Sequence, residues 1–266
     1  MRVAIVGVAG RMGAQLVKAI HDAPDMRLAA AIDQPGGNAI GKDAGSLASL
    51  PPCGVAVGGD LHVALAGIDV VIDFSRADAV AATADVCAAA GVAIMVGTTG
   101  LDAPTLGRLE AAASRVPVLV SANTSLALNV LLDLVERASS ALPVGFDIEI
   151  FEAHHRHKLD APSGTALALG EAAAAGRGEK LPRRPNLTGS APGARPSGGI
   201  GFAVVRGGDV VGEHEVRFLG SGEQLRLTHV ATDRAIFARG AVAAAAWLVG
   251  QPAGHYRMAD FLFSKQ

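Results

Sequence analysis

Three histidines, one arginine and one lysine stand together in a chain whose residues are 50% hydrophobic, in the stretch His154-His155-Arg156-His157-Lys158. Histidine and lysine side chains both serve as proton donors once their surroundings tune their pKa values. So many potential cations at one point also suit an anionic small molecule. The stretch therefore predicts a site that donates protons and binds an anion.

A helix is predicted to begin directly after this stretch, at Pro162-Ser163-Gly164-Thr165. The first N–H groups of a helix have no partner within the helix, so they bind carboxylate or phosphate groups. One segment therefore offers proton donors, positive charge and a backbone cradle for an anion.

Two other interpretations of the histidine cluster remain open. His154, His155 and His157 could bind a metal ion, or they could simply be solvated at the end of a strand. No cysteine joins the three histidines, and a strand would place His155 on the face opposite His154. We therefore predict proton donation and anion binding here, with no metal.

A glycine-rich turn lies between the first predicted strand and the first predicted helix, with the sequence Gly7-Val8-Ala9-Gly10-Arg11-Met12-Gly13. Glycines there permit a tight turn and let the backbone approach a pyrophosphate at the helix N-terminus. The spacing G-x-x-G-x-x-G departs from the usual G-x-G-x-x-G. Its place at the start of a βαβ unit favours a dinucleotide site over a plain glycine-rich turn.

An acidic residue closes the next predicted strand, at Asp33. A carboxylate in that place accepts hydrogen bonds from the hydroxyls of the adenine ribose, although a simple strand-end turn is the alternative. Asp33 would repel a 2′-phosphate, and the neutral Gln34 adds no charge to attract one. Arg11 could reach such a phosphate or could be a solvated helix residue. NADH is therefore favoured, and NADPH is tolerated.

Two more loops follow apolar strands, with the sequences Gly97-Thr98-Thr99-Gly100 and Ser121-Ala122-Asn123-Thr124. In an open α/β sheet, ligands bind beyond the carboxyl ends of the strands. Each loop alone has ordinary turn composition, so a nicotinamide contact and a plain turn are both consistent with it.

The composition favours a cytoplasmic protein that binds neither nucleic acid nor membrane. The net charge is −2, no basic stripe runs along the chain, and no apolar run is long enough to span a bilayer. A strand is predicted directly after Arg2, so we expect no signal peptide. Cys53 and Cys87 fit no metal or redox spacing, and we expect two buried thiols in a reducing compartment.

Continuous apolar strands alternate with helices in the first half of the chain. This pattern predicts an α/β fold with a Rossmann-like, doubly wound parallel sheet covered on both faces. The predicted strands are 3–7, 28–32, 70–74, 92–96 and 116–120. We place a domain boundary near Ser125, which makes residues 1–125 the dinucleotide-binding domain.

The second half is predicted to be an α+β domain, residues 126–234, that binds substrate and forms the oligomer. A helix over 125–142 precedes a strand over 147–152, and residues 177–199 are expected to form a mobile loop. Strands at 202–206, 210–219 and 224–230 are joined by glycine-rich turns and predict an antiparallel meander. Such an open, mainly antiparallel sheet invites pairing between subunits, so we expect an oligomer.

The stretch from Glu152 to Lys158, followed by Asp160-Ala-Pro-Ser-Gly-Thr165, resembles the signature of the 4-hydroxy-tetrahydrodipicolinate reductase family, also called dihydrodipicolinate reductase. The resemblance covers nearly the whole chain. It extends through residues 3–13, 97–100, 200–202 and 212–214 and the terminal helix.

The resemblance implies an enzyme of the diaminopimelate route to lysine. Members of the family pass hydride from NAD(P)H to C4 of a cyclic dicarboxylate imine, with net loss of water. The family also implies a homotetramer built by the sheets of the second domain. Its last helix packs back on the first domain, so that residues 235–266 complete the dinucleotide-binding domain.

The resemblance also implies roles for single residues. His154 corresponds to the general acid, Lys158 to a proton donor and His155 to a contact with a substrate carboxylate, while Gly164 and Thr165 form the backbone cradle. The implied cofactor contacts are Gly7, Val8, Ala9, Gly10, Arg11, Met12, Asp33, Gln34, Gly97, Thr98, Thr99, Ser121, Ala122, Asn123 and Thr124.

The chain departs from the family pattern at a few positions. Thr124 stands where Phe is frequent, Ala127-Leu128 replaces a more usual Gly-Val, and Gln34 stands where some members carry Arg. Two alternatives to the reductase are a different Rossmann dehydrogenase for another small acid and a non-catalytic NAD(H) sensor. The intact His154 and Lys158 argue against a sensor, which needs no proton donor.

Overall fold

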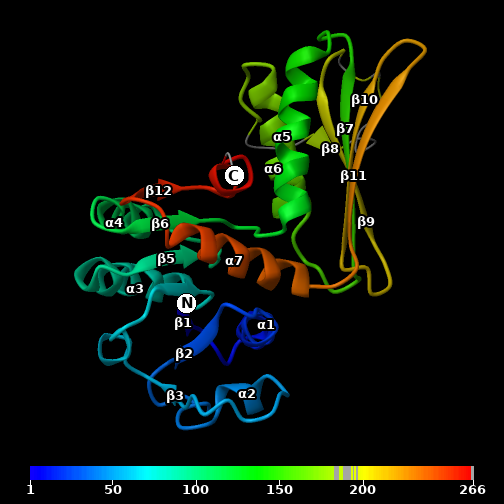
Figure 1. Ribbon diagram of the computed structural model, residues 1–266. Coiled ribbons are helices and arrows are strands. Elements are labelled where there is room, and N and C mark those ends of the chain that lie inside the picture. Colours follow the sequence, from blue (N-terminus) through cyan, green and yellow to red (C-terminus); the bar gives the residue numbers. More distant parts are fainter. Residues whose placement is uncertain (183–185, 188–192, 194, 196, 265–266) are drawn as a thin grey trace. The chain divides into compact units, whose positions relative to one another are not determined.

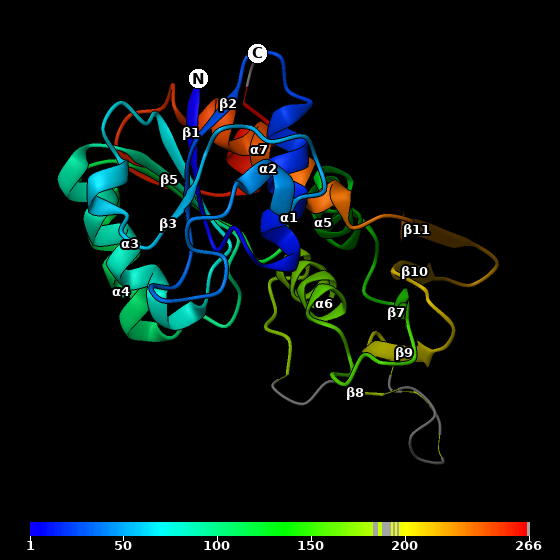
Figure 2. The same ribbon diagram turned by 90° about the horizontal axis from the view of Figure 1, so that it is seen from below.

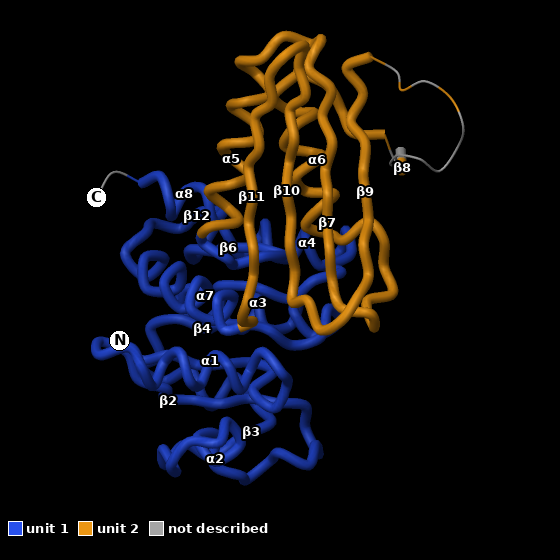
Figure 3. The backbone as a smooth tube through the Cα atoms, turned by 90° about the vertical axis from the view of Figure 1, so that its right-hand side faces the viewer, with its two compact units in different colours: residues 1–126, 235–266 blue, residues 127–234 orange. Residues whose placement is uncertain are grey.

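The computed structural model describes residues 1–182, 186–187, 193, 195 and 197–264. The chain divides into two compact units, which are coloured separately in Figure 3. Unit 1 comprises Met1–Leu126 and Ala235–Gln266, and unit 2 comprises Ala127–Arg234. The last part of the chain thus belongs to the same unit as the first.

Unit 1 is built on a seven-stranded sheet in the order β12-β6-β5-β4-β1-β2-β3 (Figure 1). All of its strand pairs are parallel. The strands are β1 (Arg2–Val6), β2 (Arg27–Ile32), β3 (Val57–Gly58), β4 (Val70–Asp73), β5 (Ala93–Val96), β6 (Pro117–Val120) and β12 (Gly254–Tyr256). The predicted Rossmann-like parallel sheet is confirmed.

Helices cover both faces of this sheet (Figure 2). One core joins α1 (Arg11–His21) and α7 (Ala235–Leu248) to alternate strand residues such as Ile5 and Ile72. The other joins α3 (Ala77–Ala90) and α4 (Ala103–Ala113) to the intervening residues, such as Val71 and Ile94. Burial on both faces explains why these strands are apolar at consecutive positions. The shorter helices are α2 (Ala44–Leu47), η1 (His62–Ala64) and α8 (Met258–Leu262).

Unit 2 contains a five-stranded sheet in the order β11-β10-β7-β9-β8, with two helices on one of its faces (Figure 3). The helices are α5 (Leu126–Ala141) and α6 (Gly164–Gly176). The strands are β7 (Asp147–His154), β8 (Asn186–Leu187), β9 (Ile200–Arg206), β10 (Gly212–Leu219) and β11 (Gln224–Ala231). Leu131 and Leu169 of the helices pack with Ile150, Phe202 and Val216 of the sheet. This confirms a second α+β domain.

The predicted antiparallel meander is wrong in its strand order. β7 lies between β9 and β10, pairing in parallel with β9 and antiparallel with β10, so the sheet is mixed. The connection from β7 to β9 passes through α6, and a helical crossover returns the chain parallel to its starting strand. Only β10 and β11 form the expected hairpin.

Three other expectations differ from the structure or fall outside it. β7 continues to His154, two residues beyond the predicted strand end. The predicted loop over 177–199 contains the short strand β8, while residues 183–185, 188–192, 194 and 196 lie outside the described residues. Cys87 is buried as expected, but Cys53 is exposed, so the expectation of two buried thiols was wrong.

Across the described residues, no helix has the length and apolar character needed to cross a membrane.

Candidate active site

The glycine-rich turn after β1 leaves no room for side chains. Gly7 has a φ of +84°, and a Cβ there would lie 2.6 Å from the carbonyl oxygen of Phe74. A Cβ on Gly13 would lie 2.2 Å from the carbonyl oxygen of Val8, because α1 begins tightly against the turn. Gly10 caps α1 without a side chain that could bond to its first N–H groups. The turn is therefore a backbone cradle at a helix N-terminus, which fits a pyrophosphate.

The carboxylate of Asp33 is tied to this turn. Its Oδ2 accepts a hydrogen bond from Ala9 N at 2.8 Å, and its Oδ1 accepts one from Gln34 N at 2.8 Å. A carboxylate has about four lone-pair sites, so these two bonds leave acceptor capacity for ribose hydroxyls. Asp33 thus has both the position and the capacity that a ribose contact needs.

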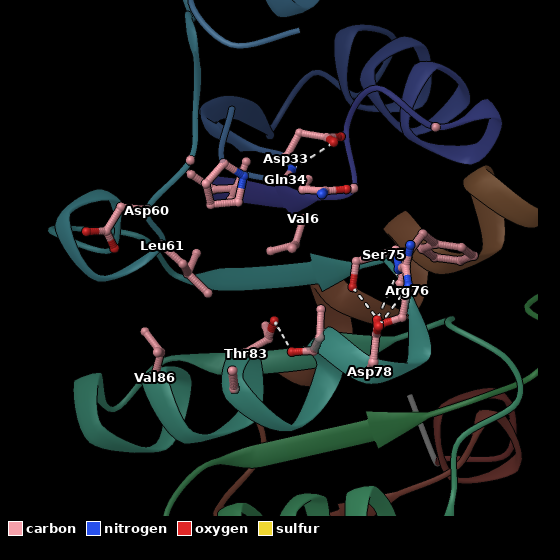
Figure 4. A pocket seen from close by; sticks show the side chains of 18 of the residues that line it. Val6, Asp33, Gln34, Asp60, Leu61, Ser75, Arg76, Asp78, Thr83 and Val86 are labelled. Carbon is pink, nitrogen blue, oxygen red and sulfur yellow. Dashed lines mark hydrogen bonds and ion pairs between the residues drawn. The ribbon is translucent and has the colours of Figure 1, made fainter. Parts of the chain in front are cut away.

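A cavity of about 770 Å³ opens beside Asp33, entirely within unit 1 (Figure 4). Its lining comes from the ends of β1 and β2, the glycine-rich turn, the loop that leads into η1, the segment after β4, and α3. The lining residues are Val6, Gly7, Gly10, Ile32, Asp33, Gln34, Pro35, Gly59, Asp60, Leu61, His62, Phe74, Ser75, Arg76, Asp78, Ala79, Ala82, Thr83 and Val86. Polar groups gather near Asp33 and Arg76, while Leu61 and Val86 supply apolar surface. Such a mixed lining fits a nucleoside.

Only some of the residues that line this cavity were predicted from the sequence. Gly7, Gly10, Asp33 and Gln34 line it, whereas the other predicted cofactor residues do not. The segment Phe74-Ser75-Arg76 was missed, although its position directly after β4 is the signal that could have identified it. Arg76 faces Asp78 in a bidentate ion pair, with Nε–Oδ1 at 3.1 Å and Nη2–Oδ2 at 2.8 Å.

The loops after β5 and β6 are held by their own side chains. Thr98 is buried, and its Oγ1 donates to Asp73 Oδ1 at 3.1 Å. Thr124 is buried as well, and its Oγ1 donates to the carbonyl oxygen of Phe237 in α7 at 2.6 Å. Ser121 Oγ donates to the carbonyl oxygen of Asn123 at 2.7 Å. These three hydroxyls therefore shape the loops, while Thr99 and Ala122 are exposed.

A fully buried carboxylate organises the histidine cluster in unit 2. Glu152 Oε2 lies 2.6 Å from His154 Nδ1 and 2.7 Å from Arg206 Nη1. Its Oε1 accepts from Arg206 Nη2 at 2.8 Å and from Ser163 N at 3.0 Å. Burial alone would raise the pKa of Glu152, but the hydrogen bonds from Arg206, His154 and Ser163 outweigh it and lower the pKa. Glu152 is therefore an anion.

The helix start predicted at Pro162-Ser163-Gly164-Thr165 is confirmed: α6 begins at Gly164, and Ser163 caps it. Ser163 Oγ accepts a hydrogen bond from Ala166 N at 3.1 Å and lies 3.0 Å from His214 Nε2. Because Ser163 N also binds Glu152, the helix start that carries Gly164 and Thr165 is fixed to the strand that carries His154.

The remaining predicted residues of the cluster have partners nearby. Lys158 Nζ donates to both carboxylate oxygens of Asp160, at 2.9 and 2.8 Å, and this bond lowers the pKa of Asp160. Arg206 Nη2 donates to the carbonyl oxygen of Asp160 at 2.7 Å, which links Lys158 to the Glu152 network. His155 Nε2 lies 3.3 Å from Arg234 Nη2. Burial, followed by the charge of Arg234, lowers the pKa of His155 and keeps it neutral near pH 7.

The arrangement suits proton transfer to an anionic ligand. His154 and Lys158 are both partly accessible, with side chains that are 11% and 20% exposed. The cationic side chains of this cluster, such as Lys158 and Arg234, and the N-terminus of α6 favour the binding of a carboxylate. Within the described part of the chain, no group of three or more His, Cys, Asp or Glu side chains is arranged to hold a metal ion.

Family models match both halves of the chain. The model for dihydrodipicolinate reductase, N-terminus, matches residues 1–124, and the model for dihydrodipicolinate reductase, C-terminus, matches residues 127–262. A 4-hydroxy-tetrahydrodipicolinate reductase from Anaeromyxobacter dehalogenans is 49% identical over 266 residues, which cover 98% of this chain and 97% of that protein. Another from Sinorhizobium medicae is 50% identical over 264 residues, with coverage of 98% and 97%.

Solved structures show the same similarity. A dihydrodipicolinate reductase from Paenisporosarcina sp. TG-14 with bound dipicolinate is 26% identical, with a TM-score of 0.78 over 98% of both chains. An amine dehydrogenase from Mycobacterium smegmatis is 14% identical, with a TM-score of 0.66 over 96% of this chain and 94% of that chain. The second similarity concerns the fold alone.

We predict that His214 makes the stability of the protein depend on pH. His214 is only 4% exposed, and burial, followed by the charge of His154, lowers its pKa from 6.5 to about 4. The unfolded chain therefore binds this proton at higher pH than the folded chain does. The contribution of His214 is complete above pH 6.5 and is lost as the pH falls towards 4, by about 2–3 kcal/mol.

The measurement is the free energy of unfolding from urea titrations between pH 7 and pH 4. His214→Gln should show a shallower decline than wild type, whatever its stability at pH 7. His21→Gln, an exposed histidine of α1, is the matched control and should follow wild type. Equal slopes for wild type and His214→Gln would contradict the prediction.

Proposed function

Because the chain belongs to the dihydrodipicolinate reductase family, we propose that His154 and Lys158 supply protons for the reaction it catalyses. That reaction is the reduction of 4-hydroxy-tetrahydrodipicolinate to tetrahydrodipicolinate, a step of lysine biosynthesis, and it depends on a nicotinamide cofactor. One observation supports this proposal most directly. Hydrogen bonds of Glu152 and Arg206 connect two accessible proton donors, His154 and Lys158, to the N-terminus of α6.

The substrate is a cyclic dicarboxylate, and its charges match the cationic groups of unit 2. The backbone of Gly164 and Thr165 at the start of α6 binds one carboxylate, and His155 contacts a carboxylate as well. These contacts orient the substrate without taking part in proton transfer.

The bound nicotinamide supplies hydride, and the protein must control the protons. Loss of the C4 hydroxyl as water leaves a conjugated imine in the ring. Hydride addition at C4 then places negative charge on this acceptor, so protonation must follow. His154 acts as a general acid, and Lys158 Nζ donates a proton to the ring nitrogen or its adjoining centre. Before donation, Asp160 holds the ammonium group in place through two hydrogen bonds.

We predict that Lys158→Ala lowers kcat by about 10²–10⁴-fold, the usual contribution of general acid catalysis. NADH affinity should stay nearly unchanged, because the dinucleotide motifs and the 770 Å³ cavity lie in unit 1. The assay follows the loss of NADH absorbance with substrate freshly generated from aspartate semialdehyde and pyruvate. Lys180→Ala, an exposed lysine of the same unit, is the control. A Lys158→Ala enzyme within about threefold of wild-type kcat would remove Lys158 from the mechanism.

We propose that the cofactors are NADH and NADPH, with NADH preferred. Asp33 brings a negative charge to the expected ribose position, and Gln34 beside it is neutral. The guanidinium of Arg76 in the same cavity is engaged by Asp78. The cavity therefore offers little to attract a 2′-phosphate.

Replacing Asp33 by Ala or Ser together with Gln34→Arg should shift the preference toward NADPH. The first change removes repulsion and ribose bonding, and the second adds a partner for the phosphate. The measurement is kcat/KM for each cofactor. Asp25→Ser, an exposed acidic residue of unit 1 outside the cavity, controls for the change in charge. An unchanged ratio would show that Asp33 does not face the ribose.

We further propose that the protein is a cytoplasmic homotetramer assembled through the sheet of unit 2. The helices α5 and α6 pack on one face of that sheet, and within the described residues of unit 2 no helix covers the other (Figure 3). Val205 of β9 and Val230 of β11 belong to that open face and are 46% and 53% exposed. Native mass spectrometry should detect four copies of the chain, and a monomer at micromolar concentration would exclude this assembly.

A further inference from the structure

The side chain of Glu152 is completely buried, at 0% exposure, in a position that an apolar residue usually occupies. It points from β7 toward the same sheet face as His154, with Arg206 at the end of neighbouring β9. Burying an ion is costly unless its partners are well placed, and removing one partner of a buried pair is strongly destabilising. The burial of Glu152 beside His154 therefore indicates a functional role for this carboxylate.

Every acceptor site of this carboxylate is filled. Each oxygen receives one guanidinium N–H of Arg206, Oε1 also receives Ser163 N, and Oε2 also faces His154 Nδ1. A carboxylate offers about four lone-pair sites, so these four donors leave no place for a proton. The lowered pKa of Glu152 agrees with this geometry. Glu152 neither gives nor receives the proton that the reaction needs.

The filled carboxylate determines which nitrogen of His154 carries a proton. An ionised carboxylate can only accept, so His154 Nδ1 must be the N–H donor across their 2.6 Å contact. Among the described residues, His154 Nε2 has no hydrogen-bond partner, and it lies where a Cβ on Gly212 would approach within 3.1 Å. The ring also packs edge-on against His214, with centroids 5.1 Å apart. The imidazole is thus held on several sides, with Nε2 left for a ligand.

We propose that Glu152 is a positioning residue that keeps one proton on His154 Nδ1, so that the proton given to the substrate leaves from Nε2, and that fixes the start of α6 relative to that ring through Ser163. The inference rests on the proposed role of His154 as the general acid. Arg206 cancels the charge of Glu152, so the pair orients the imidazole without weakening the positive field that a dicarboxylate requires. The roles of Glu152 and His154 resemble those in a catalytic triad, where a buried carboxylate sets the tautomer of a histidine and stays ionised.

Neutron diffraction from deuterated wild-type crystals at neutral pH tests the geometry without any variant. Deuterium should appear on His154 Nδ1, and none should appear on either oxygen of Glu152. Deuterium on Glu152, or a bare Nδ1, would overturn the proposal.

Kinetics of Glu152→Gln test the consequence. The change keeps the shape but removes the charge, and kcat should fall by about 10²–10⁴-fold, as tautomer-setting carboxylates do when they become amides. KM should change far less, because Glu152 does not touch the substrate. Glu171→Gln, exposed on α6, is the control and should match wild type.

Two further variants, Glu152→Asp and His154→Gln, test separately the positioning role of Glu152 and the general-acid role of His154. Glu152→Asp keeps the charge on a shorter side chain, so its kcat should lie between those of wild type and Glu152→Gln. It also replaces Glu152→Gln if circular dichroism finds that variant unfolded. A severe defect in His154→Gln together with wild-type kinetics in Glu152→Gln would overturn the positioning role and leave the proposed function intact. Wild-type kcat in His154→Gln would instead overturn the role of His154 itself.

Discussion

The ionised carboxylate of Glu152 is the constraint on which the geometry of unit 2 depends. An anion without access to water must be surrounded by donors, or it costs several kcal/mol. The donors come from β7, from β9 and from the residue that caps α6, so one side chain fixes three elements at a single point. The positions of His154, Arg206 and the helix start are therefore consequences of satisfying Glu152. Even Lys158 is connected, because Arg206 also binds the carbonyl oxygen of its partner Asp160.

Unit 1 obeys a different constraint, the close approach of backbone segments at the carboxyl ends of its parallel strands. Gly7 lies against the backbone of Phe74, and a Cβ on Gly97 would lie 2.0 Å from the ring of Phe74. Only glycine fits at both positions, so the ends of β1, β4 and β5 converge around one aromatic residue. The cavity beside Asp33 lies at the same edge of the sheet, as expected for ligands of open α/β folds. Small residues at the strand ends thus let these backbone segments pack closely at the edge of the sheet where the cavity opens.

The local parts of this architecture could be predicted from the sequence, and the long-range parts could not. The turn from Gly7 to Gly13, the strand end at Asp33 and the helix start after Ser163 are encoded by neighbouring residues. Glu152 stands in the same motif, but its partner Arg206 is 54 residues away, and only the pairing of β7 with β9 brings them together. The meander prediction failed for the same reason, because strand order depends on the crossover through α6.

The cavity shows a similar division. Asp33 and Gln34 could be predicted from their spacing to the glycine-rich turn, whereas Phe74-Ser75-Arg76 join them only because β4 lies next to β1 in the sheet. Membership of the reductase family then excludes the two alternatives, a different Rossmann dehydrogenase and a sensor, that the sequence patterns alone left open.

We propose that this chain directs hydride to a cyclic dicarboxylate while its own side chains supply the protons. The most direct measurement uses NADH that carries deuterium at its reactive carbon, mixed with the protein and freshly generated substrate. Mass spectrometry and NMR of the product should locate one cofactor-derived deuterium at C4 of tetrahydrodipicolinate, with the added proton coming from solvent. Tetrahydrodipicolinate without cofactor-derived deuterium, or consumption of NADH without this product, would contradict the account.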